Sequence, residues 1–259
     1  MMRQIALLLP LAVCLAGCGQ KRADQEESAV EKQADQEEKA VSAILKLGGK
    51  VERDEKLPGR PVVGVDLSNT NTTDTDLKDL KELNGLQALH LDGTQITDAG
   101  LKELKGLEAL RELYLNETPI TDAGLKELKE LKGLHWLWLD GTKITDAGLR
   151  DLKGLEGLLN LNLSSTQITG AGLKDLKELK GLQVLDLART QITDACLKDL
   201  KELKGLQSLW LEGTQITDAG LINLKELKGL QKLNLSGTHI TDAGLKDLRQ
   251  ALPTTNIYH

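Results

Sequence analysis

The chain is poor in aromatic residues. Its 259 residues include no phenylalanine, two tyrosines and three tryptophans, whereas hydrophobic residues of all kinds make up 40%. A conventional globular core of this size uses more bulky rings. A core built from recurring Leu, Ile and Val does not need them, so the shortage of rings favours a repeat protein.

Positive charge is not in excess either. The formal net charge is −6, and lysines and arginines are interleaved with acidic residues instead of forming a stripe. This excludes a typical nucleic-acid-binding protein. Cysteines occur only at positions 14, 18 and 196. Because Cys14 lies in a segment expected to be removed and Cys18 is expected to be lipidated, we predict no intrachain disulfide. We expect no cofactor and no metal.

The chain also lacks an apolar run long enough to span a bilayer. Its N-terminal run, Ile5 to Leu15, has eleven residues and follows Arg3, as in a secretory signal peptide. The segment Leu15-Ala16-Gly17-Cys18 then resembles the lipobox of bacterial lipoproteins. The resemblance implies a signal peptide over 1–17 and a lipid on Cys18 that holds the protein to a membrane of the cell envelope. A soluble secreted protein is the alternative.

In such lipoproteins the residue after the cysteine affects sorting. Gly19 is not the aspartate that retains many of them in the inner membrane, so the outer membrane is favoured. Residues 18–40 form a polar tether, in which Ala23–Glu27 is repeated eleven residues later as Ala34–Glu38. We interpret it as a charged, partly helical spacer, with a short coiled-coil stalk as the alternative. Residues 41–61 are interpreted as an N-terminal cap.

A 24-residue period dominates the rest of the chain. Paired apolar positions recur without insertion from Val65/Leu67 to Leu233/Leu235, and a threonine follows each pair. Seven copies continue as Ile-Thr, mostly followed by Asp-Ala-Gly-Leu, as in Ile96–Leu101. This pattern resembles the leucine-rich repeat. The resemblance implies an α/β fold: a right-handed, ribonuclease-inhibitor-like solenoid (a horseshoe) with a parallel sheet on its concave face and helices on its convex face. Eight repeats occupy 62–250, and 251–259 supply a C-terminal cap strand.

The residues of one copy predict the same layers. Leu89 and Leu91 alternate with His90, so the leucines point inward from a short strand and the residue between them points outward. Leu101, Leu104 and Leu107 are spaced three apart, which places them on one face of a helix. We expect Thr97 or Asp98 to cap that helix, Gly100 to allow close approach of helix and strand, and the threonine column to satisfy buried backbone groups.

The outward strand positions hold most of the rings. All three tryptophans and one of the two tyrosines fall in the two outward columns. Tyr114, Trp136 and Trp138 are expected to touch, with His90 alongside. The pattern predicts an exposed binding patch on the concave face; cross-strand packing without a ligand is the alternative. The predicted binding residues are Trp136, Trp138, Tyr114, Trp210, His90, Glu112 and Asp140.

We therefore predict a membrane-anchored, non-enzymatic scaffold that binds a protein, a peptide or a glycan. One alternative is a structural or assembly element of the cell envelope. A remote alternative is a hydrolase that uses Ser68, His90 and Asp66. A metal site of Asp66, His90 and Asp92 is not expected, and Cys196, which replaces the glycine of the other copies, is interpreted as a core residue.

Overall fold

The structure is a computed structural model and describes residues 18–259. The predicted signal peptide over 1–17, which includes Cys14, lies outside the described residues. The described part of the chain forms one ten-stranded sheet in which the strands follow chain order. Its strands are β1 Lys50–Arg53, β2 Val62–Asp66, β3 Ala88–His90, β4 Glu112–Tyr114, β5 Trp136–Trp138, β6 Asn160–Asn162, β7 Val184–Asp186, β8 Ser208–Trp210, β9 Lys232–Asn234 and β10 Asn256–Tyr258.

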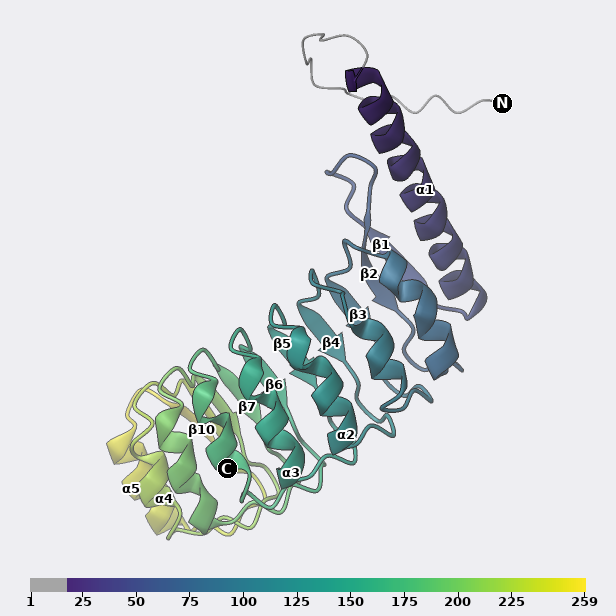
Figure 1. The fold of residues 1–259 in the computed structure, drawn as a ribbon. Coiled ribbons are helices and arrows are strands. Elements are labelled where there is room, and N and C mark those ends of the chain that lie inside the picture. The colour runs from purple at the N-terminus through teal and green to yellow at the C-terminus, as the bar shows by residue number, and fades with distance from the viewer. Residues whose placement is uncertain (1–17) are drawn as a thin grey trace.

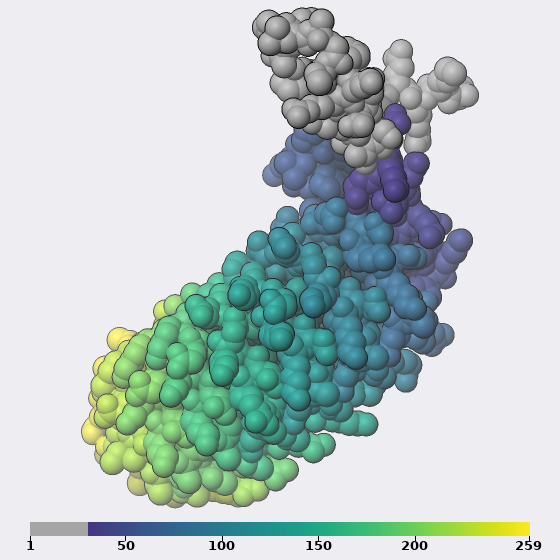
Figure 2. All heavy atoms as spheres, in the orientation of Figure 1, coloured from purple at the N-terminus to yellow at the C-terminus, as the bar shows by residue number. Residues whose placement is uncertain are grey.

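Helical segments connect the strands. The α-helices are α1 Cys18–Lys46, α2 Asp122–Leu125, α3 Asp146–Leu149, α4 Leu221–Leu224 and α5 Asp242–Ala251. The 3₁₀-helices are η1 Asp74–Glu82, η2 Gly100–Leu104, η3 Lys126–Glu130, η4 Arg150–Gly154, η5 Leu173–Glu178 and η6 Asp194–Glu202. The helical segments cover one face of the sheet along the length of a curved solenoid (Figure 1). The repeats pack into one continuous body (Figure 2). The predicted leucine-rich-repeat fold is confirmed.

Strands β2 to β10 pair in parallel with a register of 24 residues, so that Leu89 lies opposite Leu113 and Leu113 opposite Leu137. Among the strands of residues 18–259, only β1 pairs antiparallel, along β2. Because the register equals the repeat length, equivalent side chains of successive repeats lie beside one another. The leucines of each column are therefore buried together, and every column forms a continuous line across the sheet.

Most of the connecting helices are 3₁₀ rather than α, a geometry that suits the leucine spacing of three, although the short helix α4 carries the same spacing and is α. Leu101 and Leu104 of η2 are three residues apart and fully buried, and Leu107 and Leu110 continue the same spacing beyond the end of η2, with at most 3% of each side chain exposed. A helix with three residues per turn keeps such a series on one face, whereas an α-helix would rotate it away from the core. In α5 the last spacing is four, from Leu248 to Leu252, and the helix there is α.

The threonine column lies inside the turns, as predicted. Thr94, Thr118 and Thr142 are at most 3% exposed, and each hydroxyl donates a hydrogen bond of 2.6–2.7 Å to the carbonyl three residues before it. A second threonine caps the following helix in several repeats: the Thr121 hydroxyl accepts the Ala123 N–H at 3.2 Å, and the Thr145 hydroxyl accepts the Ala147 N–H at the same distance. Of the two expected capping residues, threonine is therefore the one used.

The aspartate that follows the capping threonine reaches the next repeat instead. The Asp98 carboxylate accepts the N–H and the hydroxyl of Thr121 at 2.8 and 2.6 Å. The expected role of the glycine needs a correction for the same reason. A Cβ on Gly124 would lie 2.5 Å from Oδ1 of Asp98 and 3.0 Å from a methyl group of Leu101. The glycine column thus admits the aspartate of the preceding repeat; it does not bring helix and strand together.

The N-terminal end of the core is covered by α1. Ala40, Val41 and Ile44 of this helix are buried in the core cluster. Arg53 on β1 donates hydrogen bonds to the carboxylates of Glu37 and Glu38 at 2.9 and 2.8 Å. The helix continues unbroken through residue 40, where the tether was expected to end. The tether and the first residues of the cap, 41–46, are therefore parts of one helix, and the rest of the cap follows as β1 and the turn after it.

Candidate functional site

The outward face of the sheet, hereafter the sheet face, carries a stack of rings. His90 and Tyr114 lie face to face, with centroids 4.1 Å apart and planes within 7°. Trp138 continues the stack at 5.2 Å from Tyr114, tilted by 45°. These residues occupy the same column of β3, β4 and β5, which brings their side chains within contact distance across parallel strands.

Trp136 is not part of this stack. It occupies the neighbouring column, where its register partners are Glu112 on β4 and Asn160 on β6. The expected three-way contact of Tyr114, Trp136 and Trp138 is therefore replaced by a His90–Tyr114–Trp138 stack with Trp136 beside it. Both tryptophans on β5 remain open to solvent, with 39% of Trp136 and 36% of Trp138 exposed.

A second ring pair lies nearer the C-terminal end. Trp210 on β8 stacks with Tyr258 on β10 at a centroid distance of 6.4 Å and an angle of 13°. The two rings meet above Asn234 on β9, whose shorter side chain is buried between them in the column. Tyr258 was not predicted as a ring of this face, although the predicted cap strand places it 24 residues after Asn234 in the same column.

The two predicted acidic residues are held by neighbours. Glu112 accepts a hydrogen bond from the Tyr114 hydroxyl at 3.2 Å. Burial, followed by the charge and the hydrogen bond of Glu112, raises the pKa of Tyr114 to about 12. Asp140 accepts a hydrogen bond from the Ser164 hydroxyl at 2.6 Å, and its own N–H donates to Oδ1 of Asn116 at 2.8 Å. Asp140 thus belongs to a polar ladder along the strand ends.

A hollow of about 290 Å³ opens on the sheet face between the two groups of rings. Trp138 and Trp210 form its two ends, and side chains of the two intervening strands form its floor. The lining residues are Trp138, Asn160, Leu161, Asn162, Val184, Asp186 and Trp210. Asp186, which is not among the predicted binding residues, lies on this floor. Burial, together with the nearby carboxylates of Asp140 and Glu212, raises the pKa of Asp186.

The residues of the remote hydrolase hypothesis lie near one another but are not linked as that chemistry requires. The Ser68 hydroxyl donates to Asp92 at 3.5 Å, and the Asp66 carboxylate accepts the Ser68 N–H at 3.0 Å. The His90 ring stacks on Tyr114. A nucleophile–base–acid relay needs the serine hydroxyl on the imidazole and the imidazole on the acid. Neither bond is found in the described part of the chain.

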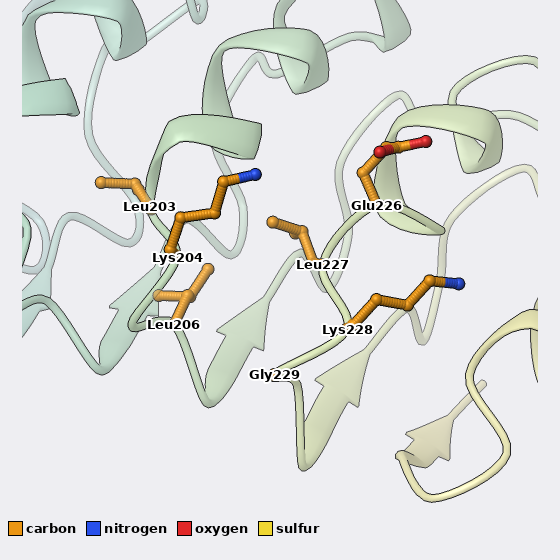
Figure 3. Close-up of a pocket in the computed structure, with 7 residues that line it drawn as sticks. All are labelled: Leu203, Lys204, Leu206, Glu226, Leu227, Lys228 and Gly229. Carbon is orange, nitrogen blue, oxygen red and sulfur yellow. The ribbon is translucent and has the colours of Figure 1, made fainter.

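A groove of about 270 Å³ lies where the chain passes from η6 into β8 and from α4 into β9, and it is lined by Leu203, Lys204, Leu206, Glu226, Leu227, Lys228 and Gly229. The charged side chains point out to solvent along its rim (Figure 3), and Leu203, Leu206 and Leu227 are buried at 1–5% exposure. It is a seam between packed repeats. Within residues 18–259, no three metal-ligating side chains gather, and no helix combines the length and hydropathy of a membrane span.

Comparison with known proteins agrees with this architecture. A family model described as leucine-rich repeat matches residues 85–105, 158–177 and 230–248. The solved structure of internalin C2 from Listeria monocytogenes superposes with a TM-score of 0.60 at 29% identity, covering 78% of this chain and 80% of internalin C2. A leucine-rich-repeat protein of Leptospira interrogans gives a TM-score of 0.54 at 26% identity, covering 70% of this chain and 51% of the other. No curated protein sequence matches.

Proposed function

The chain is a leucine-rich-repeat protein, and on that premise we propose that it is a binding scaffold whose sheet face holds a polypeptide partner. Scaffolds of this fold are typical of protein–protein interaction. The observation that carries the proposal is the exposure of Trp136 and Trp138 on β5, beside a stack of two further rings. Tryptophan and tyrosine dominate binding hot spots. Covering large rings that are partly in water makes the free energy of binding more favourable.

The outward side chains of the sheet also form a surface that is already ordered before a partner binds. Each outward side chain stands on a strand whose inward neighbours are fully buried, so the rings need little ordering when a partner arrives. Glu112 and Asp140 add acceptors at the edge of the stack, where polar rim contacts set specificity. Cross-strand stacking alone would stabilise the sheet but would not require the two tryptophans of β5 to remain exposed.

The test is a binding comparison between the wild-type chain and the Trp136→Ala/Trp138→Ala variant. Pull-down from the envelope and secreted fractions of the host is expected to recover a partner with the wild type and to lose it with the variant. The matched control is Ile222→Ala, which removes an exposed apolar side chain from the helical face. Thermal unfolding confirms that the variants fold. Undiminished recovery by the tryptophan variant contradicts the proposal, and self-association through the sheet face favours an assembly role instead.

We also propose that the scaffold is held to the cell envelope by a lipid on Cys18, in the outer rather than the inner membrane. The lipobox-like segment that ends at Cys18 supports this, and α1, which starts at Cys18, would then separate the repeats from the membrane surface. Labelling with a palmitate analogue tests it. The wild type and Cys14→Ser are expected to take up label, whereas Cys18→Ser is not. Label that survives Cys18→Ser rules out this anchor, and membrane fractionation decides between the two membranes.

A further inference from the structure

The hollow between Trp138 and Trp210 has the form of a slot closed at both ends by indole rings. The two tryptophans occupy the same column of β5 and β8, three strands apart, which corresponds to about 14 Å at the spacing of parallel strands. The column positions between them carry the shorter side chains of Asn162 and Asp186. Tall side chains at the ends and short ones between them produce the depression.

Both end walls are supported from behind. Tyr114 lies against Trp138 on the side away from the slot, at 5.2 Å, and Tyr258 stacks with Trp210 from the opposite end, at 6.4 Å. The four rings therefore form two pairs that flank the slot. Because each indole lines the hollow and has a ring neighbour on its outer side, its remaining open face is available to an occupant of the slot.

The floor of the slot is acidic. The Asp186 carboxylate accepts one hydrogen bond, from the Ala188 N–H at 2.9 Å, and lies close to the carboxylates of Asp140 and Glu212. Arg189 is the cation that offsets them. A partly buried carboxylate that is held near two others is costly to keep ionised, and such groups are concentrated at binding and catalytic sites. A cation entering the slot would reduce this cost.

We propose that this slot receives the guanidinium group of an arginine from a polypeptide partner, with Asp186 as its counter-ion and Trp138 and Trp210 as its walls. The inference rests on the proposed function and specifies the chemistry of the partner. A guanidinium is planar, stacks on indole rings, and pairs with a carboxylate through parallel hydrogen bonds. Charge complementarity with Asp186, Asp140 and Glu212 selects a cation over a neutral or anionic group.

The experiment is an NMR titration of the isotopically labelled full chain with the peptide acetyl-Gly-Arg-Gly-amide. The indole N–H signals of Trp138 and Trp210 are expected to shift saturably, whereas that of Trp136 moves little. The matched probe is the same peptide with citrulline, which has the shape of arginine but no charge; we expect it to bind about tenfold more weakly. Equal affinities, or no saturable shift at tens of millimolar peptide, overturn the proposal.

Two variants complete the test. Asp186→Asn keeps the size of the floor side chain and is expected to lower the affinity for the arginine peptide to that of the citrulline peptide. Glu178→Gln, which removes one negative charge from the helical face, is expected to leave it unchanged. Saturable shifts of the same two indoles with an oligosaccharide, and none with the arginine peptide, would assign the slot to a glycan. If Asp186→Asn retains a partner that Trp136→Ala/Trp138→Ala loses, the slot proposal fails and the scaffold proposal stands.

Discussion

The Cys196 side chain fills the space next to Gly170, between two adjacent repeats. A Cβ on Gly170 would lie 2.6 Å from the Cβ of Cys196 and would also collide with its sulfur. In the other pairs of repeats an aspartate stands at the first position and a glycine at the second, 26 residues later, as in Asp98 and Gly124. In the pair 170/196 the glycine stands at the first position and the larger residue, a cysteine, at the second. The space between the two repeats is therefore filled by one side chain in both arrangements.

This exchange predicts strong coupling between the two sites. Gly170→Asp alone is expected to destabilise the fold by about 2–3 kcal/mol, because the new side chain overpacks against Cys196 and because the backbone at Gly170 has a φ of 102°, which strains any residue with a Cβ. Adding Cys196→Gly removes the collision but not the backbone strain, so we expect it to recover part of the loss; the new carboxylate can then accept hydrogen bonds from Thr193, as Asp98 does from Thr121. Urea denaturation of the single and double variants gives the coupling free energy. Additive effects would show that the two side chains do not compete for space.

The aspartate–threonine bonds between repeats predict a large difference between two equivalent aspartates. Asp122 accepts the N–H and the hydroxyl of Thr145 at 2.8 and 2.6 Å, so Asp122→Ala should destabilise the protein by about 1–3 kcal/mol. Asp242 is the same residue of the last repeat, and its side chain is exposed, with no such bond among the described residues. Asp242→Ala is therefore the control, expected to cost about 0.5 kcal/mol through the helix N-terminus. Denaturation midpoints measure both losses of stability. Similar losses at the two sites would contradict a stabilising role for the aspartate–threonine bonds between repeats.

The buried threonine column predicts a moderate loss on Thr142→Val. The Thr142 hydroxyl donates to the Leu139 carbonyl at 2.7 Å, but the same carbonyl also accepts the Thr142 N–H at 3.2 Å. Because valine leaves the carbonyl partly satisfied, we expect a loss of about 1 kcal/mol. A chemical denaturation curve measures it. An unchanged midpoint would mean that the hydroxyl contributes nothing at this position.

Asp186 predicts a pH-dependent gain in stability for its amide variant. Burial, reinforced by Asp140 and Glu212, raises the pKa of Asp186 in the folded protein above the ordinary value of 3.8. The folded state then holds the proton more tightly than the unfolded state, so the stability contributed by the protonated form is present below the ordinary pKa and is lost as the pH rises through the folded-state value.

Asp186→Asn removes this loss, since asparagine stays neutral and its carbonyl can still accept the Ala188 N–H. We expect the variant to be more stable than the wild type at neutral pH and to lose that advantage under acidic conditions. Urea denaturation of both proteins at several pH values isolates the contribution of this residue. A variant that is less stable at neutral pH would show that the charge of Asp186 contributes favourably to the fold.

The candidate site was only partly accessible from the sequence. Trp136 and Trp138 flank the inward Leu137, and because side chains alternate between the two faces of a strand, the sequence was sufficient to place both rings on the outward face. It was not sufficient to show which of the two rings contacts Tyr114. Both rings of β5 are one strand away from Tyr114, but only Trp138 shares its column and stacks with it. Asp186 escaped notice because nothing in its own segment shows that the flanking strands carry tryptophans at the two ends of a hollow.

The sequence by itself determined the 24-residue repeat, the inward leucines and the outward columns, because a strict period and the alternation of apolar residues fix which side of each turn faces the core. Only the tertiary structure decided which side chains of neighbouring repeats meet: the Asp98–Thr121 bonds, the complementary Gly170 and Cys196, and the slot flanked by Trp138 and Trp210. These contacts depend on the lateral packing of residues more than twenty positions apart, and the chain has no local signal for that distance.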